Sequence, residues 1–114
     1  MEIEIARSNH INIVKATGRI DSFTAPRLAE AFRQLLDEHR FNLIFDMTNI
    51  DYISSAGLRV MIDVQKTCRQ EQKGELVLVG VQKRSYEALE LAGFGRLLKC
   101  YQTLDQALSN LTPQ

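Results

Sequence analysis

The chain has 114 residues, which is enough for one domain with a hydrophobic core but not for two. Its positive and negative side chains are equal in number, so the formal net charge is zero, and this argues against a nucleic-acid partner because phosphate backbones require a basic surface. No apolar run approaches the roughly 18 residues of a membrane-spanning helix, and the start of the chain does not resemble a signal peptide. We therefore expect a single cytoplasmic domain over residues 1–114, with neither nucleic acid nor membrane as a partner.

The first two predicted elements are β-strands that pair with each other. Residues 1–7 and 11–17 alternate between apolar and polar side chains on either side of a polar turn at residues 8–10. This pattern is typical of an antiparallel hairpin. Gly18 is expected to end the second strand.

A helix is predicted to follow, beginning after Thr24. Threonine is a good N-cap residue, and Pro26 falls in the first turn, where its missing N–H group costs nothing. The next apolar residues recur at helical spacing and form one core-facing stripe: Leu28, Ala31, Phe32, Leu35 and Leu36. The helix is expected to end near His39, because a polar or positive side chain suits a helix C-terminus.

The central part of the chain contains a buried strand, a loop and the start of a second helix. Residues 43–45 form an uninterrupted apolar run that ends at Asp46, which indicates a strand buried on both faces. Residues 47–53 are predicted to be a polar loop anchored by two isoleucines. Beyond Ser54 and Ser55 the apolar residues return at helical spacing. Two serines therefore lie where a buried strand leads into a helix, and open α/β sheets commonly place function at such strand ends.

The C-terminal part continues the alternation of strands and helices. Residues 76–79 indicate another buried strand, and residues 83–91 indicate a helix. The side chains expected to face the core from this helix are Tyr86, Leu89 and Ala92. Three further features complete the chain: a short edge strand at residues 97–101, a helix that opens at Thr103 and a frayed end at residues 112–114.

The predicted element order is β-β-α-β-α-β-α-β-α. Strands that are linked through helices are expected to be parallel, with right-handed crossovers. The fold class is therefore α/β, with a mixed sheet of four or five strands packed against about four helices.

The hydroxyl groups of Ser54 and Ser55 could serve in either of two ways, as a helix cap or as a site for a phosphate. Either hydroxyl can cap the helix by accepting a hydrogen bond from a free N–H group, which is worth about 1 kcal/mol. A helix N-terminus also carries roughly half a positive charge and tolerates a phosphate. Gly57 lacks a Cβ atom, which either leaves room for a partner or a phosphate, or permits close packing of the helix on the sheet.

Motifs for catalysis are missing from the sequence. It contains neither GxGxxG nor GxxxxGKS, and neither histidine follows a strand as the base of a serine hydrolase would. Asp21, Asp46 and Asp51 could gather around a Mg²⁺ near the serines, but each is also an ordinary cap or turn former. Cys68 and Cys100 are expected to be free, buried thiols. We expect no enzymatic activity, metal or cofactor.

At these residues the sequence resembles the STAS domains, and among them the stand-alone anti-sigma factor antagonists. The resemblance lies in the order strand, Asp46, loop, Ser54-Ser55-Ala56-Gly57-Leu58 and amphipathic helix, with Gly18-Arg19-Ile20-Asp21 as a second similar feature. It implies a STAS fold over almost the whole chain. In the family the phosphoacceptor hydroxyl lies two residues before the glycine, which implies Ser55, with Ser54 as the second candidate. The chain departs from the family at Ser54, where aspartate is frequent, and at Ala56, where serine or threonine is frequent.

The resemblance implies a regulator that works by partner switching. It would bind an anti-sigma factor that is also a serine kinase, release a sigma factor, and be controlled by phosphorylation of Ser55 and by a serine phosphatase of the PP2C type. The alternative is a constitutive STAS scaffold subunit of a transporter or sensory complex. The expected docking residues are Asp21, Ser22, Ser54, Ser55, Ala56, Gly57, Arg59 and Asp63. Arg59 and Asp63 are four residues apart on a helix and could instead pair with each other.

Overall fold

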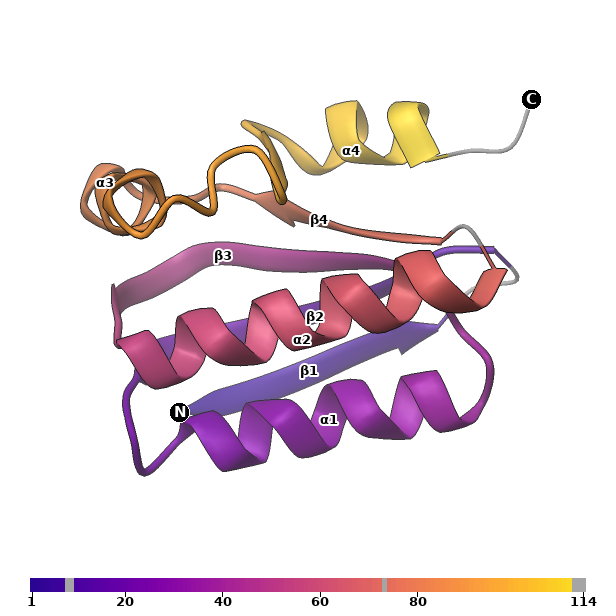
Figure 1. Cartoon of the computed structure of the whole chain (residues 1–114), viewed down its shortest axis with the longest axis horizontal. Coiled ribbons are helices and arrows are strands. Elements are labelled where there is room, and N and C mark those ends of the chain that lie inside the picture. The colour runs from indigo at the N-terminus through magenta and orange to yellow at the C-terminus, as the bar shows by residue number, and fades with distance from the viewer. Residues whose placement is uncertain (8–9, 73, 112–114) are drawn as a thin grey trace.

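The computed structural model describes residues 1–7, 10–72 and 74–111, and its sheet has helices on both faces (Figure 1). The elements are, in order, β1 (Glu2–Arg7), β2 (Asn12–Ile20), α1 (Ala25–Asp37), β3 (Asn42–Ile53), α2 (Ser55–Gln72), β4 (Glu75–Val79), α3 (Lys83–Leu91), β5 (Lys99–Tyr101) and α4 (Leu104–Leu111). The predicted order is confirmed. The turn predicted at residues 8–9 and the frayed end predicted at residues 112–114 lie outside the described residues.

The five strands form one sheet in the order β1-β2-β3-β4-β5. β1 is antiparallel to β2, whereas each of the remaining neighbours is parallel, as the helical connections predicted. β3 is therefore the central strand and is covered on both faces, which explains the unbroken apolar run at its start.

Helices α1 and α2 lie side by side over one face of the sheet, and α4 covers part of the other face (Figure 1). The larger core lies beneath α1 and α2, where the ring of Phe32 meets the ring of Phe45 edge-on at 5.4 Å between centroids. α3 adds Leu89 to this core. A smaller core beneath α4 is centred on Ala107 and Ile44.

The loop predicted at residues 47–53 is wrong, because β3 continues without a break to Ile53. β2 also continues past Gly18 to Ile20, and the two strands stay paired to their ends through two register shifts. Gly18 lies at one of these shifts with a φ of 113°, which glycine adopts readily, and the strand continues through it instead of ending there. The shifts disturb the alternation of side chains, which is why this part of β3 resembles a polar loop.

Two predictions about helix ends and faces need correction. α1 ends at Asp37, and His39 has a φ of 60°. The N–H group of His39 donates to the carbonyl of Leu36, so the histidine closes the helix by its backbone conformation and not by its charge. In α3, Leu89 is buried as expected, but Tyr86 and Ala92 are exposed and Ser85 takes the inward position.

The buried side chain of Gln65 ties α2 to two other segments. Its amide nitrogen donates to the carbonyl of Leu97 at 2.7 Å, and its amide oxygen accepts from the N–H group of Leu76 at 2.8 Å. Among the thiols, Cys68 is buried and free as predicted, whereas Cys100 is free but only half-buried. The bonds of Gln65 thus fix the middle of α2 against the start of β4 and the segment before β5.

Candidate functional site

A single residue, Ser54, separates the end of β3 from the start of α2. The N–H group of Ser54 donates to the carbonyl of Ile20 at 2.8 Å, which ties the start of the helix to the end of β2. The hydroxyl of Ser54 accepts a hydrogen bond from the N–H group of Gly57 at 3.3 Å. Ser54 is therefore the N-cap of α2, and its hydroxyl is occupied by that role.

Ser55 is the first residue of α2, and its side chain is exposed. Its hydroxyl makes no hydrogen bond with any residue in the described part of the chain. The first turn of a helix presents free N–H groups and roughly half a positive charge, which stabilise a nearby anion. The position of Ser55 thus combines an accessible hydroxyl with an environment that favours a phosphate. Ala56, next along, is half-buried and packs against the larger core.

Gly57 allows the start of α2 to pack closely on the sheet. A Cβ atom added to Gly57 would lie 2.6 Å from Cγ2 of Ile20 and 2.8 Å from Cγ1 of Ile53. Both isoleucines are buried at the ends of β2 and β3. Of the two possibilities for this glycine, the structure supports close helix–sheet packing, and the space beside it is not open to a partner.

The turn between β2 and α1 is held together by the carboxylate of Asp21. Its Oδ1 atom accepts hydrogen bonds from the N–H groups of Phe23 at 2.9 Å and Thr24 at 3.0 Å. These bonds, the one from Thr24 foremost, lower the pKa of Asp21 below its ordinary value. Thr24 is the N-cap residue of α1, as predicted, but its hydroxyl does not cap the helix and instead donates to the carbonyl of Arg19 at 2.9 Å.

Aromatic side chains that the sequence analysis did not single out lie next to this turn. Phe23 is 88% exposed, and Tyr52, near the end of β3, is 36% exposed. The guanidinium group of Arg19 lies 4.4 Å from the centroid of the Tyr52 ring, in cation–π contact. A signal for Phe23 was present, because it is an apolar residue in the polar segment DSFT and belongs to no helical stripe.

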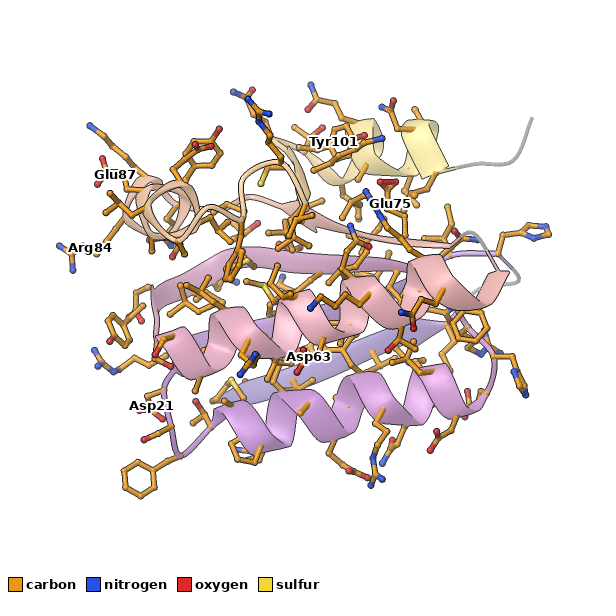
Figure 2. The ribbon with its side chains drawn as sticks, in the orientation of Figure 1. Asp21, Asp63, Glu75, Arg84, Glu87 and Tyr101 are labelled. Atoms are coloured by element: carbon orange, nitrogen blue, oxygen red, sulfur yellow. The ribbon has the colours of Figure 1, made fainter. Side chains whose placement is uncertain are left out.

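Arg59 and Asp63 are both exposed on α2 but lie in different surroundings. Arg59 is one helical turn beyond Ser55, so the two side chains share a face. No ion pair joins Arg59 to Asp63 within the described residues, so that alternative is not realised. Asp63 is about 12 Å along the axis from Ser55 and lines a groove of about 360 Å³ between α1 and α2. Figure 2 shows Asp63 between these helices and Asp21 at the start of α1.

The structure thus brings most of the predicted docking residues together at one end of the sheet. Asp21, Ser22, Ser54, Ser55 and Arg59 follow the ends of β2 and β3, whereas Asp63 lies apart and Gly57 is buried. No group of three or more histidine, cysteine, aspartate or glutamate side chains within the described residues is arranged to hold a metal ion. In the same part of the chain, no helix combines the length and apolar character that a membrane span requires.

Comparisons with known proteins agree with this architecture. A family model of the STAS domain matches residues 2–107. An anti-sigma-B factor antagonist of Listeria monocytogenes is 34% identical over 99 residues, which cover 87% of this chain and 85% of the relative.

Solved structures show the same fold at lower identity. An anti-sigma factor antagonist from Mycobacterium paratuberculosis has a TM-score of 0.86 at 21% identity, with 96% of this chain and 92% of that chain covered. Bacillus SpoIIAA in its phosphorylated form has a TM-score of 0.77 at 10% identity, with coverages of 97% and 100%. A sulfate transporter family protein from Wolinella succinogenes has a TM-score of 0.77 at 24% identity, with coverages of 93% and 88%. With the family model and the Listeria relative, the chain belongs to the STAS domain family, among the anti-sigma factor antagonists.

Proposed function

We propose that this protein binds an anti-sigma factor with serine kinase activity, releases the sigma factor held by it, and is switched off by phosphorylation of Ser55. The observation that carries the proposal is the difference between two adjacent hydroxyl groups. Ser54 uses its hydroxyl to cap α2, whereas the hydroxyl of Ser55 is exposed and has no partner among the described residues. The resemblance of the fold to a protein solved in a phosphorylated form supports the proposal.

A phosphate on Ser55 would act on the complex and not on the free protein. It adds about −1.5 to −2 charges at pH 7, at a surface that the partner covers. Burying a charge that finds no partner at an interface costs about 2–5 kcal/mol. Because about 1.4 kcal/mol corresponds to a tenfold change in affinity, phosphorylation should weaken binding by roughly thirty-fold to a few thousand-fold. A serine phosphatase of the PP2C type would restore binding, since the exposed position leaves the phosphate accessible.

The test is phosphate transfer from ATP by each purified serine-kinase anti-sigma factor of the source organism, with the modified residue located by mass spectrometry. The wild-type chain and Ser54→Ala should both take up one phosphate at Ser55. Ser55→Ala should take up none and should still bind the anti-sigma factor. Phosphate at Ser54, or in Ser55→Ala, would make the acceptor assignment wrong. A wild-type chain that binds none of these anti-sigma factors and takes up no phosphate would favour the constitutive scaffold.

A further inference from the structure

The turn between β2 and α1 presents a phenylalanine to solvent. Phe23 is 88% exposed, although phenylalanine is among the side chains most often buried in proteins. The side chain contributes nothing to either hydrophobic core among the described residues. Single exposed apolar side chains are common on protein surfaces, so the exposure of Phe23 is informative through the backbone that holds it and the residues beside it.

The backbone beneath Phe23 is held in one conformation. The N–H group of Phe23 itself donates to Oδ1 of Asp21, and the N–H group of Ala25 donates to the carbonyl of Asp21 at 2.8 Å. The N–H group of Asp21 in turn donates to the hydroxyl of Thr24 at 2.8 Å. A ring on a backbone that is already ordered loses little conformational freedom on binding, and this preorganisation favours affinity.

The exposed ring also lies on the surface that contains Ser55. The turn follows directly after Ile20, whose carbonyl accepts the N–H group of Ser54 at the start of α2. Tyr52, with Arg19 stacked on its ring, belongs to the same end of β2 and β3. Phe23 and Tyr52 are thus continuous with the proposed docking surface. Phenylalanine, tyrosine and arginine are all enriched in protein interfaces, and tyrosine and arginine are also enriched among the residues that dominate binding.

We infer that Phe23 is the apolar anchor of the docking surface and inserts into an apolar pocket on the anti-sigma factor, an inference that rests on the proposed function. Asp21 then acts as a positioning residue. Its Oδ1 atom accepts from two N–H groups of its own turn, so the carboxylate holds the backbone of Phe23. This changes the role of Asp21 from a charged docking residue to a support for the aromatic one.

The experiment measures the affinity of each variant for a panel of the source organism's purified anti-sigma factors by isothermal titration calorimetry. Phe23→Ala should weaken binding by about thirty-fold or more, which is the range of residues that dominate an interface. Phe23→Tyr should restore affinity to within about threefold of wild type. Leu91→Ala is the matched control, because Leu91 is 90% exposed but lies at the end of α3, outside the proposed docking surface. It should leave affinity unchanged.

A double-mutant comparison tests the role of Asp21. Asp21→Ala should weaken binding when Phe23 is present and should have no further effect in the Phe23→Ala background, because residues that act as a unit are not additive. Full additivity of the two losses would overturn the positioning role. If the wild-type chain binds and Phe23→Ala binds equally well, the anchor is overturned while the proposed function stands. If the wild-type chain binds no anti-sigma factor, both are overturned.

Discussion

Ser54 and Ser55 are neighbours in the chain, but their hydroxyl groups lie in different environments. The hydroxyl of Ser54 is bound to the N–H group of Gly57, whereas that of Ser55 faces solvent. The capping bond and partial burial beside the end of β3 hold the hydroxyl of Ser54 in place, whereas the hydroxyl of Ser55 can turn toward a kinase. At the residue scale, this difference between the two hydroxyls supports the proposal that Ser55 is the phosphoacceptor.

Replacing each serine by alanine should lower the free energy of unfolding only when the capping serine is removed. Ser54→Ala removes the cap of α2 and should lower the free energy of unfolding by about 1 kcal/mol, or about 4 °C in the melting temperature. Ser55→Ala touches no such bond and should stay within about 0.5 kcal/mol of wild type. Circular dichroism during thermal unfolding measures both. Equal destabilisation by the two variants would contradict the division of roles.

The two thiols should be poor nucleophiles in the folded protein. Burial raises the pKa of Cys68 to about 12 and also raises the pKa of Cys100. A raised pKa lowers the thiolate fraction, which for Cys68 at pH 8 is only about one in ten thousand. Ellman's reagent at that pH should leave Cys68 unmodified until denaturant unfolds the chain. Rapid modification of both thiols in the native protein would show that α2 opens readily.

At the scale of secondary-structure elements, Gly57 fixes how closely α2 approaches the sheet. Gly57→Ala gains about 1 kcal/mol in helix propensity, but its Cβ atom would overlap two buried isoleucines at 2.6 and 2.8 Å. Overpacking of this kind costs about 1–3 kcal/mol, so the net effect should be destabilising. Urea unfolding measures it, with Ser55→Ala as a control that adds helix propensity without a clash. A more stable Gly57→Ala protein would mean that α2 can move away from the sheet at little cost.

The identity and order of the elements could be predicted because apolar periodicity survives in the sequence. Apolar periodicity failed after Asp46, because β3 carries an extra residue relative to β2 at two register shifts and its side chains no longer alternate regularly. In α3 the inward face was misjudged because both Ser85 and Tyr86 lie about one turn from Leu89, and the apolar character of Tyr86 favoured it although the smaller Ser85 is the one that is buried.

At the candidate site, the pair of serines could be found from the sequence, but their division of roles could not. Which hydroxyl caps the helix depends on the residue at which α2 begins. The contribution of Asp21 to its own turn and that of Gln65 to the packing of α2 likewise depend on backbone groups brought close by the fold.

For the whole molecule, the proposed switch should leave the fold unchanged. A negative charge at the first residue of α2 is favourable by roughly 0.3–1 kcal/mol, and Arg59 lies one turn away on the same face, where it can pair with the phosphate. Phosphorylated protein should therefore melt at the same temperature as the unmodified form or a few degrees higher. Arg59→Ala should reduce any such gain.

Thermal unfolding and amide NMR spectra of both forms test this expectation. Chemical shift changes should stay close to the start of α2 and the turn after β2. Changes throughout the sheet, or a much lower melting temperature, would replace the local electrostatic switch with a conformational one.

The direct passage from β3 to α2 also determines what a kinase can recognise. Since Ser54 is the only residue between the two elements, the chain around Ser55 cannot be drawn into an extended conformation without unwinding the first turn of α2. A kinase that modifies Ser55 in the folded protein would therefore have to recognise a three-dimensional surface and not a linear motif. A synthetic peptide of residues 50–60 should fail as a substrate under conditions in which the folded domain is modified, and a radiolabelled ATP assay compares the two. Efficient labelling of the peptide would show that the kinase reads the sequence around Ser55 alone.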